Sequence, residues 1–224
     1  MERFVSADSQ QRGEKVGAAS GLMPPYLVLR DFLDDTTVAG LLDHAISRQT
    51  QFTPTGVGSK PRGASVDPAV RVSTALDDLG PFRPILKAKI LGLLPTLVEQ
   101  LRVTPPQEPR LETQLVAHGD GAFYKRHIDT QTALYREKDR IRVLSGVYYL
   151  HAEPKAFTGG ALRLYAIGGR EGENFIDVEP ACNSLLVFLS WAPHEVLPVS
   201  CPSRAFSDSR FAINCWIHGK KPAS

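Results

Sequence analysis

Short runs of alternating apolar and polar residues dominate the chain from residue 111 onward, with Gly, Pro, Asn and Asp clustered between them. A period of two is the pattern of a β-strand with one buried face, and the intervening residues are those that favour turns. Eight such runs suit two packed sheets of a jelly roll. We predict strands over 111–117, 123–129, 142–150, 161–165, 174–178, 185–189, 195–199 and 210–217.

Helical spacing of apolar residues occurs only in the first half of the chain. Thr36 or Thr37 can cap a helix that runs to Ser47, after a short strand at 26–29. A second helix is predicted over 82–101, and two prolines and a glycine within it indicate a kink or a split. The predicted fold is therefore mainly β with supporting helices: a double-stranded β-helix (jelly roll, cupin-like) with N-terminal helices packed on the larger sheet.

Two segments lack either pattern. Residues 1–21 are polar and mixed in charge, and we expect a disordered arm there. Residues 53–68 are rich in Gly, Pro and Ser and are expected to form a loop, which carries Lys60 and Arg62. The remainder, 22–224, is expected to be a single domain.

Composition fits one soluble enzyme domain. A chain of 224 residues with 42% hydrophobic residues can bury roughly 70% of its unfolded surface. The net charge of +2 gives no reason to expect nucleic acid or an anionic membrane as a partner. No apolar run reaches the roughly 18 residues of a membrane span, and the first 20 residues have no apolar signal core, so a cytoplasmic location is expected. Three cysteines without C-x-x-C spacing suit reduced thiols, and the oligomeric state stays open.

The candidate chemistry lies in a His-x-Asp triplet and one later histidine. On an extended strand His127 and Asp129 would project from the same face, with Ile128 packed behind them. His194 follows the buried run 185–189, where the chain turns back. Two imidazoles and one carboxylate can hold non-haem Fe(II) by half of its octahedron and leave the other half open to co-substrate and dioxygen. The pattern therefore predicts oxygen chemistry.

A lone His-x-Asp triplet is a weak signal, because most such triplets are ordinary polar residues. The other histidines fit solvent or core contacts better than a metal, and among them are His44, His151 and His218. His118 beside a glycine turn is expected to be solvated, although it could make a polar contact in the site. The residues around the triplet therefore have to show whether it binds a metal.

That context resembles a known family. The region 115–218 is similar to the catalytic core of the iron(II)- and 2-oxoglutarate-dependent dioxygenases, nearest to the prolyl 4-hydroxylase-like branch that includes the hypoxia-sensing prolyl hydroxylases. Before residue 111 the resemblance is loose, chiefly at 71–73. Six stretches carry it in the family's order: 124–129, 147–150, 158–164, 178–180, 193–196 and 210–216.

The resemblance implies that His127, Asp129 and His194 bind Fe(II) and that 2-oxoglutarate and dioxygen are co-substrates, with L-ascorbate as an accessory reductant. It implies hydroxylation with release of succinate and CO2. Because Asp129 fills its ligand position, the related halogenation chemistry is disfavoured. The catalytic core is expected at about 111–218.

A basic residue after the last histidine should hold the distal carboxylate of 2-oxoglutarate, and Arg204 and Arg210 both qualify. We favour Arg210, because alternation along 210–216 would place it on one face with Ala212, Asn214 and Trp216. The resemblance further implies that the Tyr149 hydroxyl contacts that carboxylate. It also implies apolar walls around the co-substrate and an indole ring beneath it. The implied walls are Leu162 and Val196, and the implied indole is Trp216.

The substrate is less determined. The resemblance suggests a prolyl residue in a protein or peptide, with the segment 53–68 closing over it as a lid. A free amino acid or another small metabolite is the alternative. A jelly-roll module that binds metal or ligand without catalysis is a third possibility, because fold alone does not determine function.

Overall fold

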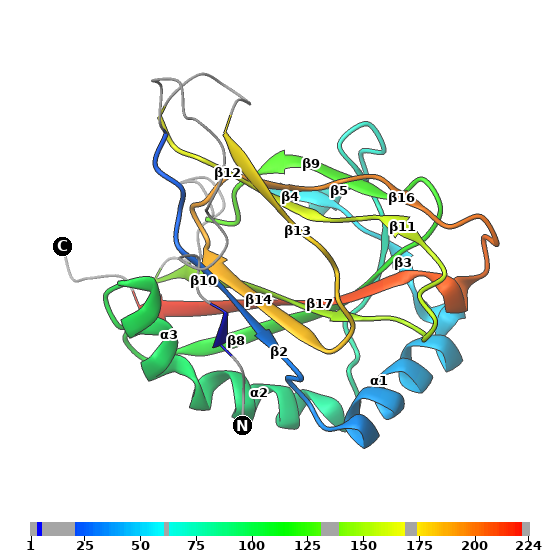
Figure 1. Cartoon of the computed structure of the whole chain (residues 1–224), viewed down its shortest axis with the longest axis horizontal. Helices are drawn as coiled ribbons and strands as arrows, with labels where there is room; N and C mark the ends of the chain where they lie inside the picture. The colour runs from blue at the N-terminus through cyan, green and yellow to red at the C-terminus, as the bar shows by residue number, and fades with distance from the viewer. Residues whose placement is uncertain (1–3, 6–20, 61–62, 131–138, 169–173, 221–224) are drawn as a thin grey trace.

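Two antiparallel sheets lie face to face in the computed structural model, with three helices against the outer face of the larger sheet (Figure 1). The structure describes residues 4–5, 21–60, 63–130, 139–168 and 174–220. This arrangement confirms the predicted jelly roll with N-terminal helices on its larger sheet.

The larger sheet has eight strands, and its longest members lie at the centre. Their order is β1 (Phe4–Val5), β2 (Tyr26–Arg30), β14 (Ser184–Leu189), β10 (Arg140–Leu150), β17 (Arg210–Lys220), β8 (Arg110–His118), β7 (Thr74–Leu76) and β3 (Thr53–Pro54).

The smaller sheet and two separate strand pairs complete the β structure. The smaller sheet runs in the order β13 (Phe175–Val178), β12 (Leu162–Tyr165), β15 (His194–Val196), β9 (Phe123–His127) and β6 (Arg71–Val72). The strand pairs are β11 (Thr158–Gly159) with β16 (Val199–Ser200), and β4 (Val57–Lys60) with β5 (Gly63–Ser65).

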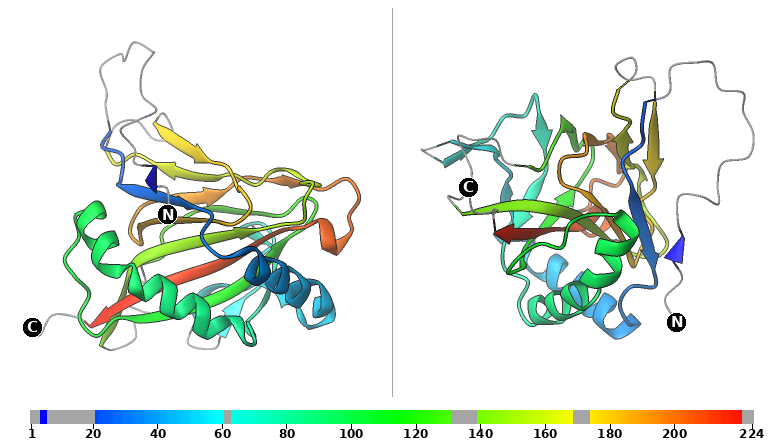
Figure 2. Two further views of the ribbon diagram at one scale, coloured as in Figure 1. Left: turned by 60° about the horizontal axis from the view of Figure 1, so that its bottom comes forward. Right: turned by 90° about the vertical axis from the view of Figure 1, so that its left-hand side faces the viewer.

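Helices α1 (Asp35–Ser47), α2 (Phe82–Gly92) and α3 (Leu94–Leu101) cover one face of the larger sheet, as the views in Figure 2 also show. Their buried leucines pack against inward-facing strand residues, for example Leu86 and Leu115, which are both fully buried. Burial of a leucine side chain contributes about 1.5–3 kcal/mol, so this helical layer stabilises the larger sheet from its outer face.

The helix predictions were right in kind and wrong in one detail. The second helix is split as expected, with α3 beginning again at Leu94 and Pro95 in its first turn. The first helix is capped by Asp34, not by Thr36 or Thr37. The Asp34 carboxylate accepts from the Thr37 backbone N–H at 2.9 Å and from its hydroxyl at 2.7 Å.

A second hydrophobic core fills the space between the two sheets. Tyr149 and Phe188 from the larger sheet meet Leu162 and Leu164 from the smaller one. These residues alternate with ones that face the helices, which explains why the strands read as nearly continuous apolar runs. The inter-sheet core fixes the distance between the sheets and therefore the geometry of anything bound at its edge.

The strand predictions missed several short strands in the first half of the chain. The segment 53–68, expected to be a loop, contains β3 and the β4–β5 pair, and β6 and β7 follow it. Strands of two to four residues are too short to show a period. In the expected disordered arm, Phe4–Val5 pairs with β2, and the rest of 1–20 lies outside the described residues.

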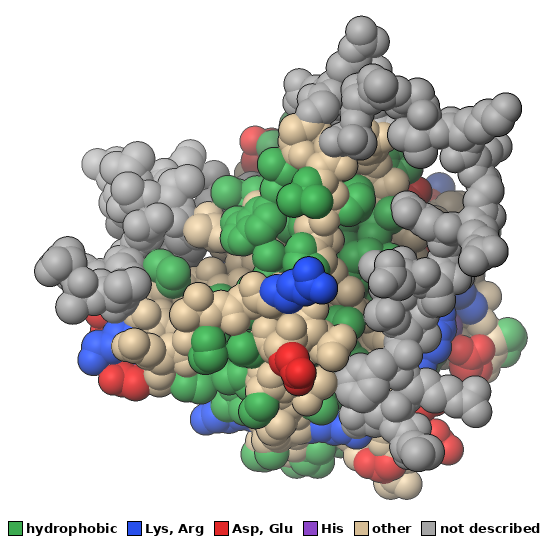
Figure 3. Space-filling model, turned by 60° about the vertical axis from the view of Figure 1, so that its left-hand side comes forward, with side chains coloured by type: hydrophobic (Ala, Val, Ile, Leu, Met, Phe, Trp, Pro, Cys, Tyr) green, Lys and Arg blue, Asp and Glu red, His purple; other side chains and the backbone are tan. Residues whose placement is uncertain are grey.

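Within the described part of the chain, no helix is long and apolar enough to cross a membrane. Figure 3 shows one face of the molecule, on which basic and acidic side chains are dispersed among hydrophobic and neutral groups. That face carries no broad basic surface of the kind that binds nucleic acid.

Candidate metal and co-substrate site

One cavity of about 470 Å³ opens at the edge of the inter-sheet core and contains most of the predicted site. His127 is the last residue of β9, and His194 is the first residue of the neighbouring strand β15. The two histidines are paired in register, and Asp129 lies just beyond them. The cavity thus brings together three residues from two segments that are far apart in sequence.

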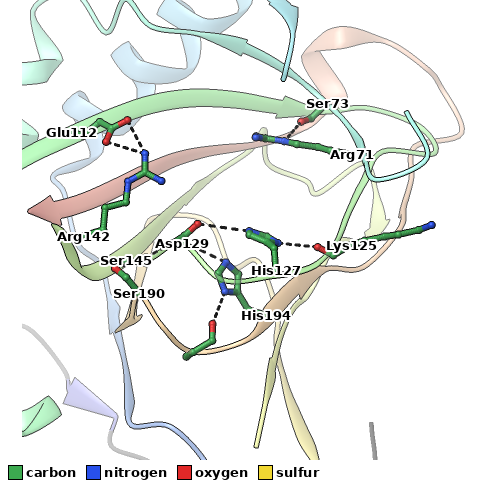
Figure 4. Close-up of polar contacts among 11 residues, drawn as sticks. Arg71, Ser73, Glu112, Lys125, His127, Asp129, Arg142, Ser145, Ser190 and His194 are labelled. Atoms are coloured by element: carbon green, nitrogen blue, oxygen red, sulfur yellow. Dashed lines mark hydrogen bonds and ion pairs between the residues drawn. The ribbon is translucent and has the colours of Figure 1, made fainter. Parts of the chain in front are cut away.

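The three side chains present their donor atoms to one point (Figure 4). His127 Nε2 lies 3.7 Å from Asp129 Oδ1, and His194 Nε2 lies 3.7 Å from Asp129 Oδ2. These distances are too long for hydrogen bonds, and all three donor atoms lie within 4.8 Å of one another. A single cation between them satisfies this arrangement.

The protonation states also suit a metal. Nδ1 of His127 donates to Lys125 O at 2.8 Å, and Nδ1 of His194 donates to Ala192 O at 2.9 Å. Since a carbonyl can only accept, each neutral ring keeps its Nε2 lone pair for a ligand. Burial, and next the neighbouring His194, lower the pKa of His127 to about 3.

Asp129 is ready to bind a cation as well. Burial alone would raise the pKa of its carboxyl, but the two histidine rings and hydrogen bonds from Ser145 and Trp216 outweigh burial and lower that pKa. The carboxylate is therefore ionised at neutral pH. The donor set of two imidazoles and one carboxylate fits non-haem iron.

Two details of the predicted triplet were wrong. The strand ends at His127, so Asp129 is not held in the cavity by strand alternation. Ile128 does not pack behind the ligands, because 44% of it is exposed. The chain bends after His127, and the Asp129 N–H donates to Ser190 O at 2.9 Å.

The buried guanidinium of Arg210 lies in the same cavity, at the start of β17. Only 1% of the residue is exposed, and its Nε and Nη2 have no hydrogen-bond partner among the described residues. The Tyr149 hydroxyl is also buried without a partner, and its ring lies 5.0 Å from the Arg210 guanidinium carbon. Burial raises the pKa of Tyr149 to about 12, so the phenol keeps its proton. These donors are ready for an anionic ligand.

His118 is the remaining partner of Arg210, and the expectation that it is solvated was wrong. His118 is buried, and its Nδ1 accepts from Arg210 Nη1 at 3.2 Å. Burial, and next the charge of Arg210, hold the pKa of His118 well below its usual range. A neutral ring is required for the acceptor role, so His118 orients the guanidinium without competing for an anion.

Arg204 is not available to this cavity. Its side chain is 81% exposed and lies 3.4 Å from Asp120 at the surface. Of the two arginines only Arg210 lines the cavity, and its role as the anchor of 2-oxoglutarate stays a prediction. Arg210, Asn214 and Trp216 all line the cavity, as alternation along the strand predicted.

The three other predicted pocket residues also lie around the cavity. Leu162 on β12 and Val196 on β15 are register partners and form adjoining parts of its apolar wall. Trp216 lies at the Asp129 side, where its indole hydrogen bond helps to lower the aspartate pKa. Leu162, Val196 and Trp216 remain predicted contacts of the co-substrate.

The remaining histidines do not line this cavity. His44 Nε2 lies 2.9 Å from Asp78 O, and His218 Nε2 lies 2.8 Å from Glu112. His151 Nδ1 lies 3.0 Å from Ala152 O, close to Glu153 and Cys182. All three rings are buried, as the core-contact alternative expected.

Comparison with known proteins agrees with this geometry. Residues 113–218 match the sequence model of the 2OG-Fe(II) oxygenase superfamily. The matched region, which contains the site, therefore belongs to that superfamily. The chain is also 40% identical over 141 residues to an uncharacterized PKHD-type hydroxylase of Synechocystis sp., in a match that covers 61% of this chain and 45% of that relative. The chain thus spans about half the length of this curated relative.

Solved structures extend the likeness to the whole fold. A prolyl-4-hydroxylase of Pseudomonas putida is 25% identical, with a TM-score of 0.62 over 88% of this chain and 93% of that chain. A prolyl hydroxylase of Trichoplax adhaerens, in complex with a hypoxia inducible factor peptide fragment, has the same TM-score at 21% identity, over 86% and 82% of the two chains. The second likeness shows the shared fold.

Several cavity residues were not assigned a role from the sequence. Arg142 donates to both carboxylate oxygens of Glu112 at 2.9 Å and stacks 4.0 Å from the Trp216 ring. Across the cavity, the Arg71 guanidinium lies 4.6 Å from the Tyr124 ring, which stacks on His127. Tyr124 lies in the family-like stretch 124–129 and Arg71 in the loosely similar stretch 71–73, whereas an ion pair between separate strands, such as that of Arg142 with Glu112, leaves no local pattern.

Gly160 keeps the space in which Arg210 lies, and this gives a first prediction. A Cβ at Gly160 would lie 2.6 Å from Arg210 Cδ and 2.9 Å from Val199 Cγ2, at a φ of +70°. We expect Gly160→Ala to displace Arg210 and weaken binding of 2-oxoglutarate by more than tenfold, measured by calorimetry with bound metal. A displacement of this kind loses at least one charge-assisted hydrogen bond, worth about 1.5–3 kcal/mol.

Gly168 provides a matched control. Its φ is +72°, but a Cβ there would meet no atom within 4 Å. Gly168→Ala therefore carries the same backbone strain without a clash. Equal losses of affinity in the two variants would show that strain, not the position of Arg210, is responsible.

Proposed function

We propose that this protein is an Fe(II)- and 2-oxoglutarate-dependent dioxygenase that hydroxylates an unactivated C–H bond of a prolyl residue in a protein or peptide. The observation that carries the proposal is the presence, in one cavity, of a three-donor metal site and a buried guanidinium with unpaired N–H groups. A buried, unpaired charge is costly, so it indicates an anionic ligand. A module that only binds metal has no need of it.

The residues would divide the work as follows. His127, Asp129 and His194 would hold Fe(II), and Arg210 and Tyr149 would hold the distal carboxylate of 2-oxoglutarate by donating hydrogen bonds to it. Leu162 and Val196 would exclude water from the co-substrate. When bound, the iron and 2-oxoglutarate supply dioxygen activation and hydroxylation, with release of succinate and CO2.

A prolyl substrate is supported by two observations. The P. putida structure, which resembles this chain over 88% of its length, is a prolyl-4-hydroxylase. In addition, Tyr124 and Trp216 both contribute aromatic side chains to the lining of the cavity. Aromatic side chains offer a large apolar surface on which a saturated ring can pack.

One observation favours a second candidate, a free amino acid or small carboxylate. Arg71 is 9% exposed and lines the cavity, and its Nε donates to Ser73 at 2.9 Å. A guanidinium at this position could bind a free carboxylate of the substrate. A peptide bond would offer no such charge.

The co-substrate site is tested by anaerobic titration with Fe(II) and 2-oxoglutarate. We expect a visible charge-transfer band from the chelate, because its formation requires both the metal and the bidentate 2-oxo acid. Folded protein that binds Fe(II) without this band would favour the non-catalytic module.

The substrate class is tested by turnover. We expect proline-containing peptides, but not free proline, to raise succinate formation and to gain one oxygen atom by mass spectrometry. L-ascorbate should prolong turnover if it serves as the accessory reductant. Stimulation by free amino acids alone would support the second candidate instead.

A reducing, cytoplasmic location is part of the same proposal. It is supported by Cys182, Cys201 and Cys215, which are all free thiols in the structure. Free thiols are typical of proteins in reducing compartments.

A further inference from the structure

The position of Asp129 needs an explanation, because the strand that precedes it ends two residues earlier. The backbone N–H groups of Asp129 and Thr130 both donate to the carbonyl oxygen of Ser190, each at 2.9 Å. Ser190 directly follows β14 and lies beside Ser145, as Figure 4 shows. One residue of the larger sheet therefore holds the backbone of the acidic ligand.

The carboxylate is held by the same part of the sheet. The Ser145 hydroxyl on β10 donates to Asp129 Oδ2 at 2.6 Å, the short distance of a charge-assisted hydrogen bond. Ser145 Oγ also lies 2.9 Å from Ser190 Oγ. Because the single Ser145 proton is used on the carboxylate, the Ser190 hydroxyl must donate to Ser145. Donation in this direction polarises the Ser145 hydroxyl and strengthens its bond to Asp129.

Both serines are buried in surroundings that otherwise favour apolar residues. Ser145 is 1% exposed and Ser190 is not exposed. The register neighbours of Ser145 are Phe188 and Trp216. A hydroxyl is costly at such a place unless its hydrogen bonds are made. Here its bond is to the carboxylate of the predicted metal site.

We propose that Ser145 and Ser190 form a clamp that holds the Asp129 carboxylate in the position from which it would bind the metal. The inference rests on the proposed function, and it makes both serines positioning residues that act through Asp129.

The clamp is tested by anaerobic Fe(II) titration of the full chain, with and without 2-oxoglutarate. We expect Ser145→Ala to bind Fe(II) about tenfold or more weakly, the usual loss when a partner of a metal ligand is removed. Its charge-transfer band should shift, because the carboxylate is no longer held in one position. Ser145→Thr keeps the hydroxyl and should restore most of the affinity.

Ser184 gives a matched control on the neighbouring strand. It is also 1% exposed, and its hydroxyl donates to Ala181 O at 2.7 Å, with no part in the cavity. Ser184→Ala should therefore bind Fe(II) as the wild type does. Ser190→Ala keeps the backbone carbonyl that holds Asp129 and should show a smaller loss than Ser145→Ala.

Two results would overturn the clamp: Fe(II) binding by Ser145→Ala that matches the wild type, or an equal loss in Ser184→Ala. Thermal unfolding of each metal-free variant verifies the fold, and Ser190→Ala provides the same test if Ser145→Ala does not fold. If the proposed function itself were wrong, the wild-type protein would bind no Fe(II), which distinguishes that failure from a failure of the clamp.

Discussion

Asp129→Ala should lose both Fe(II) binding and 2-oxoglutarate turnover. The substitution removes the only carboxylate among the three donor residues and leaves two imidazoles. Loss of a supporting partner alone costs about 10–100-fold in metal affinity, so loss of the ligand itself should exceed about a hundredfold. Fe(II) affinity is measured anaerobically, and turnover as succinate released per substrate hydroxylated.

Asp177→Ala is the control for loss of an acidic residue. Asp177 on β13 accepts two hydrogen bonds from Arg163, at 2.7 and 2.8 Å, and does not line the cavity. This variant should retain both metal binding and coupled turnover. Hydroxylation at the wild-type rate by Asp129→Ala would refute the assignment of the metal ligands.

The arrangement of the sheets could be predicted because alternation is a local property. Each central strand carries its own period of two, and β10, β14 and β17 appear within three residues of their predicted bounds. The jelly roll then follows, since apolar faces of this length must be covered by a second sheet or by helices. The split between α2 and α3 was equally local, because a proline marks it.

The positions of the site residues could be predicted only where they depend on the residue itself and on the strand face that it occupies. His127 and Arg210 lie on predicted strands, and their cavity-facing positions follow from alternation. His194 was expected at the turn before a strand, and it is the first residue of β15. Asp129 does not lie on a strand, and its position depends on Ser190, 61 residues later in the chain. A contact between distant segments has no period, so the sequence could suggest the ligand but not what holds it.

The burial of His118 shows the same limit. Beside a glycine turn it resembles a solvated surface residue, yet β8 places it directly opposite Arg210 in register. Only the pairing of β8 with β17 reveals that the two side chains meet. Register between non-adjacent strands is a tertiary property that one sequence does not show.

Arg210→Met should raise the KM for 2-oxoglutarate by roughly thirtyfold or more, because removal of one partner of a buried charge pair costs about 2–5 kcal/mol. The methionine keeps an unbranched apolar side chain but neither the charge nor the fork of N–H donors. Arg210→Lys restores the charge alone and should be intermediate. Steady-state kinetics with saturating substrate separate this effect on KM from any change in kcat.

The stability of the same variant distinguishes an anchor from a structural arginine. In the ligand-free protein, Nε and Nη2 of Arg210 are buried without partners, so their removal should leave the melting temperature unchanged or raised. Added 2-oxoglutarate with metal should stabilise the wild type and not Arg210→Met, since a ligand stabilises only the state that binds it. Arg204→Met, which changes a surface residue paired with Asp120, should behave as the wild type in both measurements. If Arg210→Met were strongly destabilised while its 2-oxoglutarate affinity stayed intact, Arg210 would serve the fold, and the anchor would have to lie elsewhere in the cavity.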